Sequence, residues 1–498
     1  MTWIFQHRYR IIIALLGVSI FIGMWHAFPL RFVVFDEMFY VGSVLKALSQ
    51  HTLLPQGTDV PYGTLTYLFN FALIVIFLAG MLPWYGFDLE RLTHALTTSP
   101  EIVSWIPRLA SALVYLALLV FFKRFFDREL GDRRLSTILL VLLFTNMITA
   151  IIFHTGKVWV LSTALVLFSF YFLYRAMTEQ EEKRRSRHAL TSIVASFLAV
   201  ANFPIMAFGL INVPAIAFAF RRNRRMLLRA AGYVAAGVLA AGAVAALNAH
   251  GITSQIRGVF ENYLLSPEAV AKNLSFVSSL GLYLAKIALL FPLHFIAIVY
   301  AARAGIRNKK LFHLSLAYGI AYLLTIAVTA RWAVDFHWYF RYLFPFGFFL
   351  TLLLASFNLR PTRFFYGLAG VSLIYFFFTL YYLSVPTTFN QARTWVTHNL
   401  NDPAAVIVNR EQEVEFPLNR ASAAAMRESE CGVLCRAARE KNLNAWFSPL
   451  ILDSKSATGT PSGTEHNLFF LEERTTEKPG RKLLASFGVA ENDDAYFS

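Results

Sequence analysis

Hydrophobic residues along this chain form repeated long runs that are separated by short polar and basic segments. Runs of roughly 18 to 22 residues predict membrane-spanning helices, because about 20 helical residues cross a hydrocarbon core about 30 Å thick. We expect about 11 spans, within a range of 11–13. They lie near 11–30, 105–122, 136–153, 158–176, 189–204, 205–220, 230–249, 277–302, 311–330, 342–357 and 364–385.

The pattern changes at Pro386, after which polar and charged residues dominate. Short apolar runs at 405–408 and 467–471 lie between clusters of Gly, Pro, Ser and Thr, which is typical of strands and turns. The sequence therefore predicts an all-α polytopic membrane domain over 1–385. A C-terminal soluble domain of α+β type is expected over 386–498, which is a reasonable size for one domain.

Composition supports the membrane class. Of the 498 residues 57% are hydrophobic and 15% are charged, whereas soluble domains are typically about 25% charged. The net charge of +15 raises the question of nucleic acid. However, the basic residues gather in short loops between apolar runs, which is the distribution that orients membrane proteins. We therefore expect no nucleic-acid partner. These loops are Arg133–Arg134, 183–187, 221–225 and 307–310.

The basic loops also predict the orientation. The N-terminal segment ends in His7-Arg8-Tyr9-Arg10, which favours a cytoplasmic N-terminus. The first apolar run has no small-residue cleavage site, so we interpret it as a retained helix. An odd number of spans then places the C-terminal domain outside, in the periplasm if this is a bacterial inner-membrane protein. The region 31–104 falls on the same exterior side.

The segment Thr64–Leu82 does not fit this parity, because it is apolar enough to span. Counting it would move Lys123, Arg124, Arg133 and Arg134 to the exterior. We favour a re-entrant or interfacial helix packed against the bundle, since such backbone is tolerated where protein covers it. The alternative is one half of a hairpin with residues 86–104.

The chain has two cysteines, Cys431 and Cys435, both in the predicted exterior domain. An oxidising compartment permits a disulfide between them, although an i, i+4 spacing requires local distortion of a helix. No further Cys or His lies near them in sequence to complete a metal site. We favour the disulfide, and two buried free thiols are the alternative.

Two adjacent acids, Asp36 and Glu37, follow the first apolar run. Acids are costly at membrane depth, so such a pair commonly marks chemistry or an ion path. Apolar residues at helical spacing after Asp36 predict an amphipathic helix over 36–50. Asp36 stands where an N-cap belongs, so a simple capping role is the alternative interpretation.

Four pieces of sequence, in order, resemble motifs of the GT-C type glycosyltransferases. They are Asp36-Glu37 followed by Tyr40, the proline-led stretch 61–67, Ile106-Pro-Arg-Leu-Ala-Ser-Ala-Leu113, and Phe340-Arg-Tyr-Leu-Phe-Pro345. This superfamily includes protein O-mannosyltransferases and the aminoarabinose transferases that modify lipid A. The similarity extends over about residues 11–385, and implies a GT-C-like bundle with exterior interfacial helices.

The resemblance implies transfer of a sugar from a polyprenyl-phosphate or polyprenyl-diphosphate carrier to an acceptor hydroxyl. The acceptor is a glycan, a lipid or a protein, and the lipid bilayer is the surrounding partner. The acceptor oxygen must lose a proton as it attacks, which a carboxylate within reach can accept. Asp36 is the candidate general base by its position in the family motif, and Glu37 supports it.

The leaving lipid phosphate needs cations or hydrogen-bond donors that are already in place. Arg341 matches the family element and is the first candidate, because a guanidinium can bind phosphate through two hydrogen bonds. Other exterior candidates for binding substrate or phosphate are Lys157, His337, Arg331, Tyr40 and Tyr62. For the basic residues among these candidates, the alternative role is snorkelling to the membrane surface or pairing with Asp335.

The chain departs from the family in one place. Several members carry a second acid at the start of the helix that here begins near Val158, but this stretch reads Gly156-Lys-Val-Trp-Val-Leu161. We therefore expect no metal site and no cofactor, and a metal-independent mechanism. A polytopic transporter or lipid flippase is the alternative class, with Lys286 and Pro292 in one span as its best features. A catalytically inactive relative is a further alternative.

Overall fold

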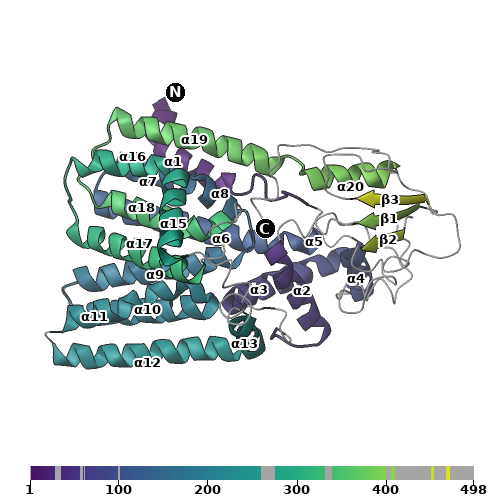
Figure 1. Cartoon of the computed structure of the whole chain (residues 1–498), viewed down its shortest axis with the longest axis horizontal. Helices are drawn as coiled ribbons and strands as arrows, with labels where there is room; N and C mark the ends of the chain where they lie inside the picture. Colours follow the sequence, from purple (N-terminus) through teal and green to yellow (C-terminus); the bar gives the residue numbers. More distant parts are fainter. Residues whose placement is uncertain are drawn as a thin grey trace. The chain divides into compact units, whose positions relative to one another are not determined.

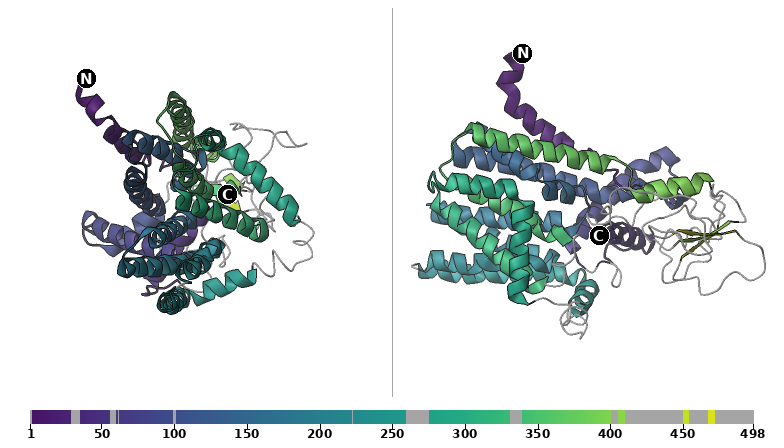
Figure 2. Two further views of the ribbon diagram at one scale, coloured as in Figure 1. Left: turned by 90° about the vertical axis from the view of Figure 1, so that its left-hand side faces the viewer. Right: turned by 45° about the horizontal axis from the view of Figure 1, so that its top comes forward.

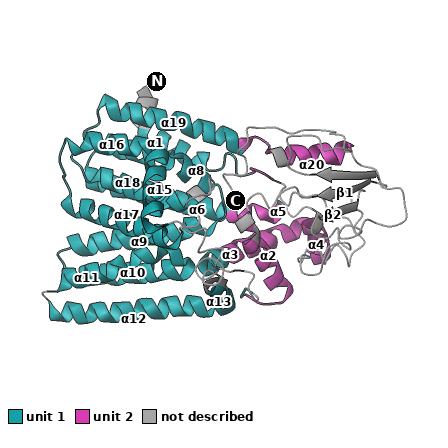
Figure 3. Ribbon diagram, viewed as in Figure 1, with its two compact units in different colours: residues 1–24, 54–69, 108–383 teal, residues 25–53, 70–107, 384–498 magenta. Residues whose placement is uncertain are grey.

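The computed structural model describes residues 2–28, 35–55, 60, 62–98, 101–221, 223–258, 275–330, 339–399, 405–409, 450–453 and 467–471. The chain divides into two compact units, coloured separately in Figure 3. Unit 1 contains residues 1–24, 54–69 and 108–383, and unit 2 contains residues 25–53, 70–107 and 384–498. Unit 2 thus groups much of the predicted exterior loop region with the C-terminal part of the chain.

Unit 1 is a bundle of helices (Figure 1). Its main elements are α1 (Thr2–Ser19), α6 (Ile106–Leu130), α7 (Arg133–Phe144), α8 (Met147–Phe153), α9 (Val158–Thr178), α10 (Glu182–Asn202), η3 (Pro204–Ile211), α11 (Asn212–Phe220), α12 (Arg224–Ala246), α13 (Ala249–Gly258), α15 (Phe276–Leu290), α16 (Pro292–Ala302), α17 (Lys309–Thr329), η6 (Tyr339–Leu343), α18 (Phe344–Ala355) and α19 (Arg363–Ser384).

Several of these helices can cross a membrane by length and composition, which confirms the membrane class. Among the described residues six helical segments qualify alone, and up to eight if each of two bent pairs is one span. The expected helices at 158–176, 311–330 and 364–385 are observed as α9, α17 and α19. Shorter apolar helices lie at Tyr9–Ser19, Pro204–Phe220 and Arg341–Ala355. The expected total of 11 stays a prediction.

Polar residues fix where the helices begin. The side chain of Asp132 accepts hydrogen bonds from the backbone N–H groups of Arg134 and Leu135 at the start of α7. Asn223 caps α12 and Asn308 caps α17 in the same way. Such caps satisfy backbone donors that have no partner inside the helix, and each contributes about 1 kcal/mol.

Helices α9, α10 and α12 lie side by side, as the views in Figures 1 and 2 show together. A network of buried polar side chains joins α9, α10, α11 and α17. The Asn212 amide nitrogen donates to Ser192 Oγ (2.7 Å) and Ser196 Oγ (3.0 Å) and also to Ser169 Oγ. The hydroxyl of Tyr318 donates to the Asn212 amide oxygen. Interhelical hydrogen bonds of this kind help to hold helices together in a membrane.

Two expected spans are broken. The helix expected over 136–153 bends by 67° between α7 and α8, and the one expected over 277–302 bends by 87° between α15 and α16. Asn146 caps α8, and its amide nitrogen donates to the carbonyl of Leu290 at the end of α15 (3.4 Å). Pro292 begins α16, where its fixed φ and missing N–H are tolerated.

Two ends of the unit 1 bundle are identified by their contacts. At one end Lys310 Nζ donates to the Met177 carbonyl (2.7 Å) and Arg185 donates to the Ala219 carbonyl (3.1 Å). We call this the basic end, since the basic loops of the sequence lie there. At the other end, which holds Lys157 and which we call the Lys157 end, Asn202 at the end of α10 bonds Ser162 in α9.

Unit 2 contains α2 (Phe35–Ser49), η2 (Leu82–Tyr85), α4 (Leu89–Thr98), α5 (Glu101–Ser104), α20 (Thr388–Asn399) and the strands β1 (Ala405–Asn409), β2 (Leu450–Asp453) and β3 (Asn467–Leu471). The helix α3 (Thr64–Met81) begins in unit 1 and continues into unit 2. The strands form a parallel sheet in the order β2-β1-β3. The strand-like runs expected at 405–408 and 467–471 are thereby confirmed as strands.

Hydrogen bonds within unit 2 join its distant segments. The Asn390 amide nitrogen donates to the carbonyls of Ala27 (3.1 Å) and Phe28 (2.7 Å). The Trp25 indole donates to the Ser384 carbonyl (3.2 Å). The residues that follow α1 are therefore tied to those that follow α19. The domain boundary expected at 385–386 stays a prediction.

Candidate functional site

The acidic pair lies at the start of α2. The helix begins at Phe35, so Asp36 is its second residue and not the N-cap that the sequence indicated. An acid in the first turn still interacts favourably with the helix dipole. The Asp36 side chain lies outside the described residues.

Two other predicted site residues lie on the same helix. Glu37 is 3% exposed and Tyr40 is 1% exposed. The expected amphipathic helix is confirmed, with Tyr40, Val44 and Ala47 on its buried face. A buried carboxylate is costly unless nearby charges or hydrogen bonds compensate its burial. The surroundings of Glu37 must therefore supply that compensation.

Lys157 lies at the Lys157 end of unit 1, immediately before α9, and is 3% exposed. Hydrogen bonds hold the turn in front of it. Thr155 Oγ1 donates to the Ile152 carbonyl (2.7 Å), and Ser111 Oγ in α6 donates to the Thr155 carbonyl (2.6 Å). The ammonium group is thus carried by a turn that is anchored to a neighbouring helix. This is not the mobile surface position that snorkelling would predict.

Arg108, near the start of α6, is a buried charge that the sequence interpretation did not single out. It is 2% exposed, and its guanidinium donates to the Met24 carbonyl (2.8 Å). Within the described residues the buried Asp, Glu, Lys and Arg side chains are Glu37, Arg108 and Lys157. In the sequence Arg108 stood out only as part of the 106–113 motif. A single arginine in an apolar run does not indicate whether its side chain is buried.

His154 lies in the turn between α8 and α9 and is 3% exposed. Its Nδ1 bonds the Ala150 carbonyl (2.6 Å), and Nε2 has no hydrogen-bond partner within the described part of the chain. Burial lowers the pKa of His154, and the positive charge of Arg108 lowers it further. Both effects disfavour the protonated imidazole, whereas the hydrogen bond to the Ala150 carbonyl favours it.

Aromatic contacts bring three other predicted site segments together. Trp159, two residues after Lys157, packs edge-on against Tyr342, with ring centroids 5.0 Å apart. Tyr342 follows Arg341, which is partly exposed at η6. Trp159 also packs against Phe203 (4.9 Å), which contacts the ring of Tyr62 (5.6 Å).

Hydrogen bonds fix the segment around Tyr62. The amide oxygen of Asn202 accepts a hydrogen bond from the backbone N–H of Thr66 (3.1 Å). The Asn248 amide nitrogen donates to the Val60 carbonyl (2.7 Å). Gly251 is required beside it, since a Cβ there would lie 2.2 Å from the Val60 oxygen. Tyr62 is thereby positioned by α10 and by the chain after α12.

Several predicted site residues cannot be placed. Arg331 and His337 lie outside the described residues, as do Pro61, Cys431 and Cys435. In the described part of the chain, no group of three or more His, Cys, Asp or Glu side chains could hold a metal ion. The metal-independent mechanism and the disulfide stay predictions.

Unit 1 therefore presents two buried cations, Arg108 and Lys157, at the end of the bundle where Tyr62 and Arg341 also lie. Cations and aromatic rings in that combination suit a phosphorylated ligand with a lipid portion. The first turn of α2 in unit 2 supplies a different chemical group, a pair of acids.

Comparison of the chain with protein-family models, curated proteins and solved structures finds no match.

Proposed function

We propose that this protein is a membrane glycosyltransferase that moves a sugar from a polyprenyl-phosphate or polyprenyl-diphosphate carrier to an acceptor hydroxyl on the exterior face. The observation that carries the proposal is the burial of Lys157 at 3% exposure, at the same end of the bundle as Tyr62 and Arg341. A lysine held inside a membrane protein at a helix start is costly unless it serves a ligand or a structural partner.

The proposed reaction assigns the base to α2. The acceptor oxygen attacks the anomeric carbon of the sugar while its proton passes to the carboxylate of Asp36. The bond between that carbon and the phosphate oxygen breaks, and the lipid phosphate leaves with the electron pair. Glu37 supports the base.

Phosphate binding is assigned to unit 1. Arg341 and Lys157 bind the leaving phosphate and stabilise its growing negative charge, because cations that are already positioned need no reorganisation during the reaction. Tyr62 is assigned a binding role beside them, with Tyr40 next to the acids. His337 and Arg331 are further candidates in the same chain region.

Replacing Asp36 by Asn tests the base. Asn has nearly the same size and shape as Asp, so this change keeps the volume of the side chain while it removes the carboxylate that accepts the proton. We expect glycan transfer to fall by 10² to 10⁴-fold, on the order that general bases contribute. The assay uses membranes that contain the variant, a polyprenyl-phosphate sugar donor and mass analysis of envelope glycans.

Asp88→Asn is the matched control, because among the described residues the carboxylate of Asp88 accepts backbone hydrogen bonds at the start of α4 and pairs with Arg91. It should transfer sugar at the wild-type rate. Wild-type transfer by Asp36→Asn would show that Asp36 is not the base.

The broken helices favour a second candidate, a transporter or lipid flippase. Discontinuous helices often form transport sites, and here His294 is fully buried after the α15–α16 break, with Nε2 bonded to Thr351 (3.1 Å). A transporter would move lipid-linked sugar across vesicles without changing its covalent structure. Mass analysis of the substrate after transport distinguishes the two functions.

A further inference from the structure

Arg341, the first candidate for phosphate binding, lies on the short 3₁₀-helix η6. Such helices have poorer hydrogen-bond geometry than α-helices, so the position of η6 depends on the elements that contact it. Arg341 is partly exposed, whereas the next residue, Tyr342, is 8% exposed. The buried neighbour therefore fixes the backbone from which the guanidinium extends.

A buried hydroxyl of α17 holds this backbone. Tyr322 is 0% exposed, and its hydroxyl donates to the Tyr342 carbonyl (2.5 Å). The Tyr322 ring packs against Phe208 of η3, with centroids 4.6 Å apart, and against Phe346 of α18 (5.1 Å). Trp159 of α9 packs against the ring of Tyr342 itself (5.0 Å). Tyr342 is thus fixed through its carbonyl by α17 and through its ring by α9.

A second buried tyrosine holds the start of the same connection. Tyr283 of α15 is 2% exposed, and its hydroxyl donates to the carbonyl of Ala330 (2.8 Å), directly after α17. The connection from Ala330 to Tyr342 carries three predicted site residues: Arg331, His337 and Arg341. Both ends of this connection are therefore hydrogen-bonded to buried tyrosine hydroxyls.

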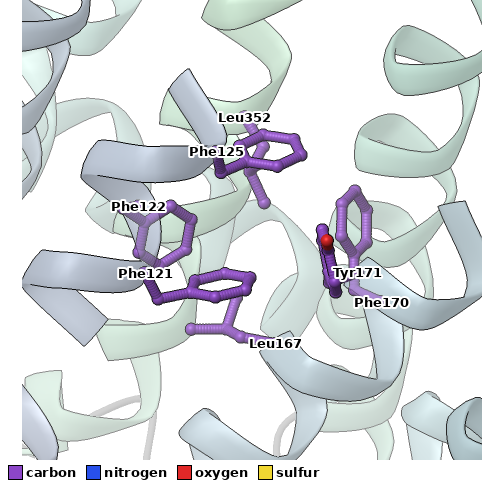
Figure 4. A pocket seen from close by; sticks show the side chains of 7 residues that line it. All are labelled: Phe121, Phe122, Phe125, Leu167, Phe170, Tyr171 and Leu352. Carbon is purple, nitrogen blue, oxygen red and sulfur yellow. The ribbon is translucent and has the colours of Figure 1, made fainter. Parts of the chain in front are cut away.

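These hydroxyls are not needed to fill space. Where α6, α9 and α18 meet, aromatic rings pack against one another and phenylalanine is the commonest residue (Figure 4). The side chains there are Phe121, Phe122, Phe125, Leu167, Phe170, Tyr171 and Leu352. The tyrosine among them, Tyr171, is partly exposed. A buried hydroxyl is costly unless it is bonded, so a tyrosine in place of phenylalanine at 283 and 322 indicates a use for its hydrogen bond.

We propose that Tyr322 and Tyr283 are positioning residues for phosphate binding. Tyr322 acts through the Tyr342 carbonyl to hold Arg341 where its guanidinium meets the phosphate of the lipid carrier, and Tyr283 holds the start of the connection. A displacement of about 1 Å removes much of the effect of such a group, because the charge must already be in place. The inference rests on the proposed function, since it takes Arg341 as a phosphate ligand.

Binding of undecaprenyl phosphate to the purified full-length protein in detergent tests the proposal, with undecaprenol as the probe that lacks the phosphate. Native mass spectrometry measures both. We expect Tyr322→Phe to weaken undecaprenyl phosphate binding by about fivefold, the factor that one ordinary hydrogen bond is worth. Tyr283→Phe should weaken it in the same direction. Neither change should alter the binding of undecaprenol, because an uncharged alcohol makes little use of Arg341.

Tyr318→Phe is the matched control. Tyr318 lies one turn before Tyr322 on α17, is equally buried, and its hydroxyl bonds Asn212 and Ser169 instead of η6. We expect this variant to lower the melting temperature but to bind undecaprenyl phosphate like the wild type. A loss of binding in Tyr318→Phe equal to that in Tyr322→Phe would show that destabilisation alone explains the effect.

The variant Arg341→Gln separates this inference from the proposed function. It should weaken undecaprenyl phosphate binding by at least about tenfold, because charge-assisted hydrogen bonds to phosphate are lost. Adding Tyr322→Phe to it should weaken binding no further, since the tyrosine acts through Arg341. Additive losses would overturn the positioning role, and so would wild-type binding by either tyrosine variant, while Arg341 remained a ligand. Wild-type binding by Arg341→Gln would contradict the proposed phosphate site itself.

Discussion

In unit 1 a buried side-chain amide links several helices through hydrogen bonds. Asn212 is 0% exposed and connects Ser169, Ser192, Ser196 and Tyr318 from three other helices. One side chain can bond all four, because a primary amide combines two donors with an acceptor in a small volume. The amide therefore specifies how these helices pack.

Asn212→Leu should destabilise the protein. The substitution removes the four hydrogen bonds of the amide, and at roughly 0.6 kcal/mol for each membrane hydrogen bond the loss is about 2 kcal/mol. Thermal unfolding of the purified protein in detergent measures it. Thr329→Val is the control, because the exposed Thr329 hydroxyl donates to the carbonyl of Thr325 in its own helix. An equal melting temperature for Asn212→Leu and the wild type would contradict this role.

At the scale of elements, the breaks between α7 and α8 and between α15 and α16 are joined by one residue. The amide oxygen of Asn146 accepts hydrogen bonds from the backbone N–H groups of Ile148 (3.1 Å) and Thr149 (3.4 Å). Its amide nitrogen donates to the Leu290 carbonyl. Each break leaves backbone groups that an intact helix would satisfy. A cap that also reaches the neighbouring helix end keeps both bends compatible with an apolar surrounding.

Asn146→Ala and Asn146→Ser should separate these two roles. Serine can still cap α8 but is too short to reach Leu290, whereas alanine loses both interactions. We expect alanine to lower the free energy of unfolding by about 1 to 2 kcal/mol and serine by less than half of that. Denaturant unfolding in detergent measures the difference. Equal effects of the two variants would show that the cap contributes nothing.

The straight helices were predictable from the sequence, and the breaks were not. Each of α9, α17 and α19 is one apolar run between polar ends, so its bounds follow from composition alone. The bends at Asn146 and Phe291 occur inside runs whose hydrophobicity is continuous, and only Asn146 and Pro292 hint at them. The contact between Trp159 and Tyr342 joins residues far apart in sequence, which periodicity cannot indicate.

At the scale of the whole molecule, α3 decides the topology. With η2 it forms a candidate span of 22 residues, Thr64–Tyr85. Its start is tied to the Lys157 end through Asn202 and Asn248. Ser111 at the start of α6 is tied to the same end through Thr155. If α3 crossed the membrane, residues 86–105 would have to cross back.

Those residues are poorly suited to cross a membrane. The helix α4 carries Glu90, Arg91 and His94 on its exposed side, and charged groups facing lipid are costly. We therefore retain the interfacial interpretation of α3 as a prediction. The exposed residues Trp84 and Phe87 at the end of η2 suit a membrane surface, where aromatic side chains are enriched.

Cysteine labelling in intact cells tests this topology. In a background with Cys431→Ser and Cys435→Ser, we expect Asp88→Cys to react with a membrane-impermeant maleimide from outside. Lys183→Cys, in a predicted cytoplasmic loop, should react only after permeabilisation. Reaction of Asp88→Cys only after permeabilisation would show that α3 spans the membrane.

The parallel sheet β2-β1-β3 sets an order in which its strands can pair during synthesis. Its central strand, β1, is made first, yet Val406 pairs with Leu450 and Leu468, both dozens of residues later in the chain. Such non-local pairing closes slowly. If synthesis stopped before Leu468, β1 would keep one open edge, and open strand edges invite aggregation. The sheet therefore cannot close until the chain has been made as far as Leu471.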